Sequence, residues 1–219
     1  ALEGVLNNPN KPVAAIIGGS KVSTKIDVIN FLLKKMDIII IGGAMANTFV
    51  AAKGLDVGAS LFEKECIDLA KELIEKSQNN NCNLILPTDF IVSKNLKKNA
   101  EYTTTNFDSM PHNMMALDIG PKSIELINKN INNCKTILWN GPLGAFETYP
   151  FDKGTNKVAS HVSSLTKQKK ILSVAGGGDT VSALNNAKVL NDFSYVSTAG
   201  GAFLEWLEGK VLPGIEPIS

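Results

Sequence analysis

Short runs of apolar residues alternate with helical patterns along almost the whole chain, and this order limits the fold more than any other feature. Residues 13–17, for example, precede a stretch with apolar side chains three and four apart from about Ser23 to Met36. Continuous apolar strands that alternate with helices are typical of a parallel sheet with helices on both faces. The sequence therefore predicts an α/β fold, a three-layer Rossmann-like domain with a six-stranded parallel sheet. The expected strands are residues 13–17, 38–41, 84–86, 136–139, 171–175 and 195–197.

The segments between these strands complete the expected order. Ser23 and Thr24 can cap the first helix, and Pro121 suits the first turn of another. Residues 87–113 are less regular and indicate short extended pieces, while residues 211–219 resemble an extended tail. No repeat, linker or low-complexity block divides the sequence, so we expect one domain over residues 1–219. The expected helices are residues 23–36, a short one ending at Ala52, 61–76, 121–130, 154–165, 180–187 and 202–208.

Composition and charge exclude several classes of protein. With 44% hydrophobic and 20% charged residues, the sequence is not that of a disordered chain. The apolar run at 38–41 is far shorter than the roughly 20 residues of a membrane span, and the polar opening predicts no secretory signal. A net charge of +1 gives no reason to expect a nucleic acid or a membrane as partner. All 22 basic residues are Lys, so a phosphate must be held by Lys, by backbone N–H groups or by a metal.

The cysteines and histidines do not form a metal or catalytic pattern. Cys66, Cys82 and Cys134 are an odd set without metal-ligand spacing, and we expect reduced thiols in a cytoplasmic protein. His112 and His161 are far apart in the sequence. We therefore expect both histidines at the surface or at helix ends.

Glycine residues stand just after the carboxyl end of almost every expected strand. Pairs or triplets stand at 18–19, 42–43, 176–178 and 200–201, and the fifth loop reads NGPLG at 140–144. Ligands bind beyond the carboxyl ends of the strands in this architecture. A tight turn explains glycine in any one loop. Five such loops on one edge favour a multiply charged phosphate ligand instead, because the following helices aim free N–H groups outward.

Charged residues beside these loops supply further candidates. Lys21 and Lys25 are four residues apart, so if the helix has begun there, both project from one side of its first turn. The helix dipole disfavours cations at this end unless an anion compensates their charge. Solvated surface lysines are the alternative. Asp179 can cap a helix or hold Mg²⁺ bound to phosphates, and Glu147 can accept hydrogen bonds from a ribose. The P-loop motif is absent, and the nearest match to a dinucleotide fingerprint fails at Val181.

Four motifs, in order and spacing, resemble those of phosphoglycerate kinase. They are GGSKVSTK at 18–25, WNGPLGAFE at 139–147, GGGDT at 176–180 and STAGGA at 197–202, and LPG at 212–214 matches as well. The resemblance covers essentially all of this chain, but only the carboxyl-terminal, nucleotide-binding half of the family's protein. It implies a missing amino-terminal domain that binds 3-phosphoglycerate through a basic, arginine-containing patch. Ala199 and Ala116 stand where relatives carry Gly, so a need for positive φ would distort these two positions.

The resemblance implies reversible phosphoryl transfer between 1,3-bisphosphoglycerate and MgADP, which gives 3-phosphoglycerate and MgATP in glycolysis. It implies that Lys21 reaches the transferring phosphoryl group, together with the glycine-rich helix starts at Gly177 and Gly200. Lys25 would hold the α- and β-phosphates, and Asp179 would bind Mg²⁺. The other implied nucleotide-binding residues are Asn140, Pro142, Gly177, Gly178 and Thr180, Glu147 at the ribose, and Gly19, Gly43, Leu61, Leu117 and Ala145 around the adenine.

The same resemblance sets the expected partners. The chain is expected to bind ADP or ATP with Mg²⁺, to be a monomer, and to be inactive alone because the missing domain forms one wall of the cleft. The alternative is a free-standing adenine-nucleotide-binding module or a partner-assembled subunit, which an exposed apolar patch would favour. An NAD-type oxidoreductase is disfavoured by the failed fingerprint. A structural α/β domain without a ligand leaves the glycine-rich edge unexplained.

Overall fold

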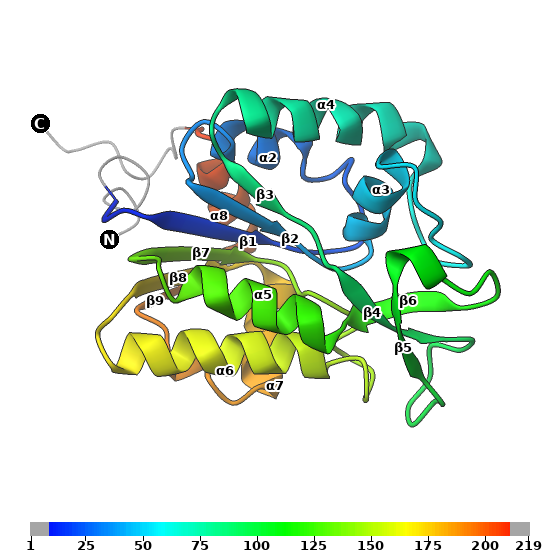
Figure 1. The fold of residues 1–219 in the computed structure, drawn as a ribbon. Coiled ribbons are helices and arrows are strands. Elements are labelled where there is room, and N and C mark those ends of the chain that lie inside the picture. Colours follow the sequence, from blue (N-terminus) through cyan, green and yellow to red (C-terminus); the bar gives the residue numbers. More distant parts are fainter. Residues whose placement is uncertain (1–8, 211–219) are drawn as a thin grey trace, which may run out of the picture.

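The computed structural model describes residues 9–210, and a sheet of parallel strands runs through the middle of the molecule (Figure 1). The strand order is β3-β2-β1-β7-β8-β9, and every neighbouring pair is parallel. The predicted six-stranded parallel sheet is therefore confirmed. Its strands are β1 (Val13–Ile17), β2 (Ile38–Ile41), β3 (Asn83–Ile85), β7 (Thr136–Asn140), β8 (Leu172–Gly176) and β9 (Tyr195–Ser197).

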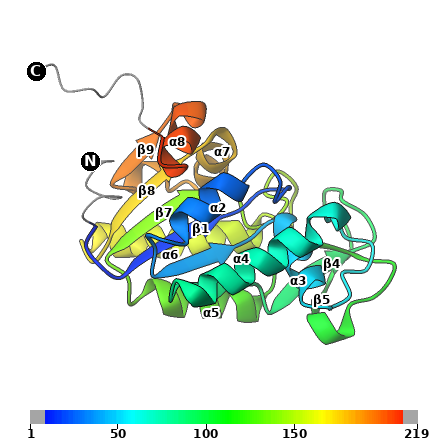
Figure 2. The same ribbon diagram turned by 90° about the horizontal axis from the view of Figure 1, so that it is seen from above.

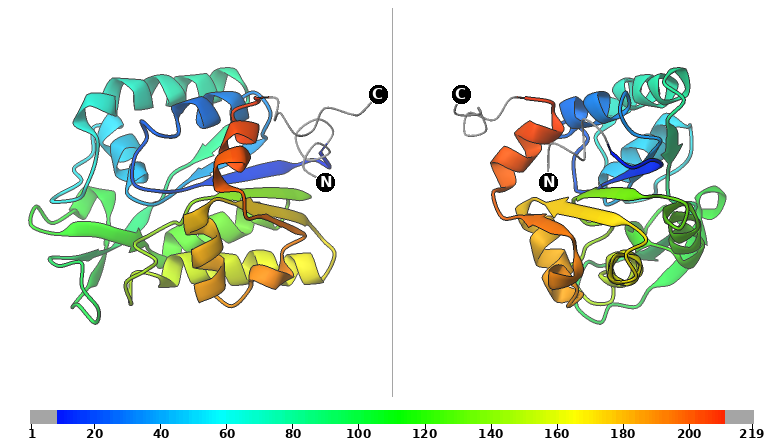
Figure 3. Two further views of the ribbon diagram at one scale, coloured as in Figure 1. Left: turned by 180° about the vertical axis from the view of Figure 1, so that it is seen from behind. Right: turned by 90° about the vertical axis from the view of Figure 1, so that its left-hand side faces the viewer.

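Helices cover both faces of this sheet, which confirms the three predicted layers. The end-on view on the right of Figure 3 shows the sheet between α2 and α4 on one side and α6 on the other. One face carries α2 (Ile26–Leu32), α3 (Met45–Ala52), α4 (Ile67–Asn79) and α8 (Gly200–Leu207). The other face carries α5 (Pro121–Ile131), α6 (Lys153–Lys167) and α7 (Gly178–Asn186). Three short 3₁₀ helices are η1 (Lys64–Cys66), η2 (Phe107–Ser109) and η3 (Leu190–Asp192).

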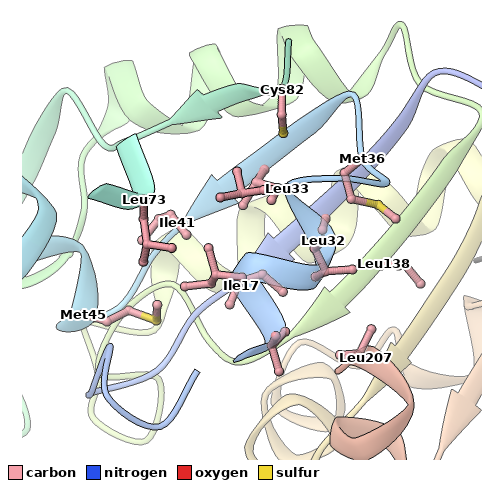
Figure 4. Close-up of a cluster of buried hydrophobic side chains, with 14 of the residues drawn as sticks. Ile17, Leu32, Leu33, Met36, Ile41, Met45, Leu73, Cys82, Leu138 and Leu207 are labelled. Carbon is pink, nitrogen blue, oxygen red and sulfur yellow. The ribbon is translucent and has the colours of Figure 1, made fainter. Parts of the chain in front are cut away.

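The two main apolar cores follow from the alternation of side chains along the strands. In β1, Val13, Ala15 and Ile17 belong to the core under α2, α3, α4 and α8, whereas Ala14 and Ile16 belong to the opposite core. Every residue of β1 is buried, as expected for a central strand of a sheet that is covered on both faces. Figure 4 shows the first of these cores, where labelled side chains from β1, β2 and β7 meet those of the helices above them.

The chain enters a second sheet after β3. This sheet is antiparallel, has the order β5-β4-β6 and lies at one end of the molecule (Figures 1 and 2). The short extended pieces expected in residues 87–113 are confirmed as β4 and β5, whereas β6 was not predicted. The strands are β4 (Asp89–Ser93), β5 (Thr103–Asn106) and β6 (Met115–Ile119). A separate small core joins this sheet to α3, and its buried members are Val50, Val57, Phe90, Val92 and Met110.

Two buried aspartates fasten the small sheet to the main body. Asp89 accepts hydrogen bonds from the backbone N–H groups of Lys122 (3.0 Å) and Ser123 (2.7 Å) at the start of α5. Asp118 accepts one from the N–H of Gly154 (2.6 Å) in the first turn of α6. Because the first turn of a helix has unpaired N–H groups and a partial positive charge, a carboxylate there stabilises it. The small sheet is therefore anchored at the N-termini of two helices.

The predicted start of the first helix is wrong. α2 begins at Ile26, and no side chain caps it. The hydroxyl of Ser23 donates to Glu63 (2.5 Å), and the hydroxyl of Thr24 donates to the carbonyl oxygen of Lys21 (2.9 Å). Both candidate capping groups are therefore used to shape the loop that precedes the helix.

The remaining expectations concern a second helix start, the tail and the thiols. The helix expected from residue 61 begins only at η1, because Glu63 has an extended backbone (φ −99°, ψ 100°). The expected tail at 211–219 lies outside the described residues. The three cysteines are free and buried. Within residues 9–210, no helix is both long and apolar enough to cross a membrane.

Candidate functional site

A cavity of about 320 Å³ opens at the carboxyl edge of the main sheet, near the point where the strand order reverses between β1 and β7. Its walls come from the loops after β1, β2 and β7, from the first turn of α7, and from β6 of the small sheet. The structure thus gathers around one cavity residues that are far apart in the sequence. The predicted residues that line it are Gly19, Gly43, Leu61, Leu117, Pro142, Ala145, Glu147 and Asp179, and Ala116 also lines it.

A second group of predicted residues, which we call the Lys25 corner, consists of Lys25, Asn140 and Thr180. The Lys25 ammonium contacts the side-chain oxygen of Asn140 and lies 3.5 Å from the main-chain oxygen of the same residue. The Asn140 amide donates to the carbonyl oxygen of Gly176 (2.8 Å), which turns its Oδ1 toward Lys25. The hydroxyl of Thr180 accepts the N–H of Gly141 (2.7 Å). The first turn of α7 and the loop after β7 are therefore tied together beside Lys25.

The charge of Lys25 is poorly compensated. Burial lowers the pKa of Lys25 to about 8, and the carboxylate of Asp179 opposes this shift. Among residues 9–210, no carboxylate lies within 4 Å of the Lys25 ammonium, and its hydrogen-bond partners are the neutral oxygens of Asn140. A partly buried cation with neutral partners is less stable than one that has a negative charge beside it. The Lys25 corner is therefore suited to an anion.

The first turns of α7 and α8 lie side by side next to this corner. A Cβ atom at Gly200, the first residue of α8, would lie 3.5 Å from the backbone nitrogen of Gly178, the first residue of α7. Gly178 and Gly201 face open space, since no atom of the described residues lies within 4 Å of the position of a Cβ there. Gly177 has a φ of +98°, and a Cβ there would lie 2.7 Å from the amide nitrogen of Asn140. Two helix N-termini, with their unpaired N–H groups, therefore meet at one open region.

Another glycine of this edge serves the packing of loops against each other. A Cβ atom at Gly18 would lie only 1.9 Å from the carbonyl oxygen of Pro142, so the loops after β1 and β7 touch through their backbones. Close packing of two loops therefore explains glycine at this position. The open space at Gly178 and Gly201 is different, because it is available to a ligand.

Three other sequence-based interpretations can now be assessed. Lys21 is exposed and does not line the cavity. The condition under which Lys21 and Lys25 would share the first turn of a helix is not met, because both precede α2 and Lys25 has a non-helical backbone (φ −125°, ψ 8°). Asp179 lies in the first turn of α7 but does not cap it. Ala199 has a φ of −88°, which alanine adopts without strain.

Several residues of the site were not found from the sequence. Phe90, Leu96 and Met115 line the cavity from the region of the small sheet. Asp118 also lines it and is only 3% exposed. A lone carboxylate within the otherwise apolar residues 115–119 was a signal that could have identified it.

The sequence model of the phosphoglycerate kinase family matches residues 1–210. The chain belongs to the phosphoglycerate kinase family. It is 54% identical over 218 residues to the phosphoglycerate kinase of Methylorubrum extorquens (strain PA1), covering 100% of this chain and 54% of that protein. It is 53% identical over 216 residues to that of Sinorhizobium fredii (strain NBRC 101917 / NGR234), covering 99% of this chain and 54% of that protein. The chain thus spans about half the length of the curated relatives it matches.

Solved phosphoglycerate kinase structures share this fold. The enzyme from Coxiella burnetii superposes with a TM-score of 0.92 at 44% identity, covering 96% of this chain and 54% of that one. The enzyme from Pyrococcus horikoshii OT3 superposes with a TM-score of 0.80 at 25% identity, covering 97% and 53%. The resemblance found in the four motifs is therefore confirmed, and the family assignment stands against an NAD-type oxidoreductase.

Proposed function

We propose that this chain is the nucleotide-binding half of a phosphoglycerate kinase. The whole enzyme transfers a phosphoryl group between 1,3-bisphosphoglycerate and MgADP, giving 3-phosphoglycerate and MgATP, and a second half outside this chain carries the phosphoglycerate site. The observation that carries the proposal is the position of Lys25. This partly buried cation has neutral partners and lies between an apolar cavity and two open helix starts.

The cavity suits the base and ribose of an adenine nucleotide. Its volume of about 320 Å³ lies at the small end of the range for ligand pockets. Leu61, Leu117 and Ala145 offer apolar contacts to the faces of the base. Glu147 is exposed where it lines the cavity, so its carboxylate can accept hydrogen bonds from the ribose hydroxyls. The nucleoside part would therefore be held mainly by apolar packing, with one carboxylate for orientation.

The phosphates extend from the cavity to the Lys25 corner. Lys25 pairs with the α- and β-phosphates and gains the negative charge that its present partners lack. The N-terminus of α7 favours phosphate oxygens, because a helix start has free N–H groups and a partial positive charge. The groups there are the N–H groups of Gly177 and Gly178 and the hydroxyl of Thr180. The neighbouring N-terminus of α8 adds a second positive dipole end for the transferring group.

The residues present also fit Mg²⁺. This ion prefers oxygen ligands and usually takes only one or two carboxylates, with phosphate oxygens and waters completing its shell. Asp179 is exposed, lines the cavity and has no capping role. Within residues 9–210, no group of three or more His, Cys, Asp or Glu side chains could hold a metal ion by itself. When bound, Mg²⁺ neutralises charge on the phosphates.

The transfer step needs placement and charge more than it needs a base. An acyl phosphate already has a good leaving group, and the main requirement is neutralisation of the transferring oxygens. Lys21 stands on an exposed loop of the same edge, where it is accessible to a phosphoryl donor bound by the second half. The chain alone lacks one wall of the cleft, so we expect nucleotide binding without turnover.

Calorimetric titration of this chain tests the proposal. We expect heat of binding with MgADP and none with 3-phosphoglycerate or NADH. An adenine-nucleotide-binding module without the kinase reaction remains the second candidate, and addition of a separately produced amino-terminal half of a family member distinguishes the two. Recovery of phosphoryl transfer supports the kinase half, whereas nucleotide binding that never leads to transfer supports the module. Failure to bind MgADP contradicts both.

Replacing Asp179 with alanine is expected to abolish the Mg²⁺ dependence of nucleotide binding and leave the fold intact. The carboxylate is exposed and makes no cap, so its loss removes a metal ligand without opening the core. The affinity for ADP should then be the same with and without Mg²⁺. Asp68→Ala is the matched control, because Asp68 is also exposed in the first turn of a helix. Unchanged Mg²⁺ dependence in the Asp179→Ala chain would rule out the metal assignment.

A further inference from the structure

The loop that carries Lys21 is tied to a distant segment through one carboxylate. Glu63 lies between α3 and η1, and its Oε2 accepts the backbone N–H of Ser23 at 3.0 Å. Its Oε1 accepts the hydroxyl of Ser23 at 2.5 Å. Ser23 and Glu63 are 40 residues apart in the sequence. This two-point contact restrains both the backbone and the side chain of the loop two residues after Lys21.

Glu63 is itself held by the buried face of α3. Its backbone N–H donates to the hydroxyl of Thr48 (3.0 Å), and the amide of Asn47 donates to the carbonyl oxygen of Leu61 (3.0 Å). Thr48 and Asn47 are 0% and 2% exposed, so they form a rigid base for this segment. Because Leu61 lines the cavity, the same segment contacts the proposed base site on one side and the Lys21 loop on the other.

The charges agree with this arrangement. Burial would raise the pKa of Glu63, but the hydrogen bonds from Ser23 outweigh that effect and, with the nearby Lys21 ammonium, hold the pKa below its usual value. Glu63 is therefore ionised at neutral pH and accepts charge-assisted hydrogen bonds. The carboxylate therefore binds the loop through Ser23 and is attracted by the charge of Lys21 on the same loop.

We propose that Glu63 is a positioning residue for Lys21, acting through Ser23. It holds the loop after β1 so that Lys21 faces the transferring phosphoryl group, and it connects that loop to the wall of the base cavity at Leu61. This inference rests on the proposed function, because it requires Lys21 to act on a phosphoryl group. Ser23 and Glu63 lie at the surface, so their contact orders a loop more than it supports the core.

The ratio of MgATP affinity to MgADP affinity tests this role. Only MgATP carries the phosphoryl group that Lys21 is proposed to contact, so MgADP is an internal reference. We expect Glu63→Ala to weaken MgATP binding about fivefold to tenfold and MgADP binding less than about twofold. The effect on MgATP is smaller than the roughly tenfold to 150-fold of a charged hydrogen bond lost directly, because Lys21 itself is kept. Ser23→Ala removes one of the two hydrogen bonds and should shift the ratio in the same direction by a smaller factor. Glu65→Ala is the charge-matched control, because Glu65 is exposed two positions further on.

A double substitution distinguishes positioning from general support of the structure. If Glu63 acts through Lys21, then Glu63→Ala has no further effect on the ratio in a Lys21→Ala chain. Equal weakening of both nucleotides, or an unchanged ratio in both Glu63→Ala and Ser23→Ala, overturns the role of Glu63 while the nucleotide site stands. A wild-type chain that binds neither nucleotide overturns the proposed function and this inference with it.

Discussion

Replacing Asp118 with alanine is expected to lower the free energy of unfolding by about 2–4 kcal/mol, the combined scale of a lost helix cap and of buried N–H groups left without a partner. The Asp118 carboxylate is 3% exposed and accepts the N–H groups of Ile119 (2.9 Å) and Gly154 (2.6 Å). In the alanine chain the Gly154 N–H loses its partner in the first turn of α6. Urea unfolding followed by circular dichroism measures the loss.

The same substitution is expected to weaken nucleotide binding, because Asp118 lines the cavity and follows Leu117 in β6. A Cβ atom at Gly144 or at Gly154 would lie 2.2 or 2.4 Å from Asp118 Oδ1, so two other segments close tightly around this carboxylate. Its removal leaves a gap in the cavity wall. If Asp118→Ala lowers the free energy of unfolding by less than about 1 kcal/mol, Asp118 does not anchor the small sheet.

The pH dependence of stability provides a second measurement on Asp118. Burial raises the pKa of Asp118 well above its usual value, against the hydrogen bonds from Gly154 and Ile119 and with a contribution from Asp152. The folded chain therefore holds this proton more tightly than the unfolded chain. The resulting stabilisation is complete below about pH 4 and is lost as the pH rises through the folded-state pKa.

Asp118→Asn has no titrating group at this position and serves as the reference. The free energy of unfolding of the wild type, minus that of Asp118→Asn, should fall as the pH rises above about 4. Asp108→Asn, at an exposed aspartate of the same region, is the control and should show a much flatter difference. A wild-type advantage that grows with pH would contradict the raised pKa.

The main sheet could be predicted from the sequence because its strands are defined locally. The run at 38–41 is four isoleucines, and each strand of the main sheet except β3 is followed closely by a glycine-rich turn. The small sheet offers a weaker signal, because residues 87–113 indicate short extended pieces but not how they pair. Thr103–Asn106 has one buried residue out of four, and it becomes a strand only because β4 lies beside it. Pairing of this kind depends on distant residues, so it could not be found from a local pattern.

The residues of the site also divide into those with a local sequence signal and those that depend on distant partners. Lys25, Asp179 and the glycine-rich loops were predicted because they stand beside strand ends and in recognisable motifs. Glu63 and Asp118 were not, because each acts through a partner that is remote in sequence: Ser23 is 40 residues from Glu63, and Gly154 is 36 residues from Asp118. The sequence thus identifies the residues that meet the ligand better than those that hold the site in place.

Replacing Lys25 with methionine is expected to weaken MgADP binding by about 1–3 kcal/mol, or roughly fivefold to 150-fold, because a charged hydrogen bond to phosphate is lost. Methionine keeps much of the length of the side chain, and the main-chain oxygen of Asn140 keeps the N–H of Gly18 (2.9 Å) as a donor. We therefore expect the fold to persist. Calorimetry measures the affinity, and Lys34→Met is the control at an exposed lysine of the same region.

Binding of the nucleotide should also be coupled to the uptake of a proton by Lys25. Burial lowers the pKa of Lys25 to about 8, so at pH 8 about half of the free chains carry a neutral amine. Phosphates placed beside it raise that pKa, and each binding event then takes up about half a proton at pH 8 and much less at pH 6, where Lys25 is already charged. Titration of MgADP in buffers with different ionisation enthalpies measures this number. The uptake should disappear in Lys25→Met and remain in Lys34→Met. If the wild type shows no uptake at pH 8 and Lys25→Met binds MgADP as tightly as the wild type, Lys25 does not meet the phosphates.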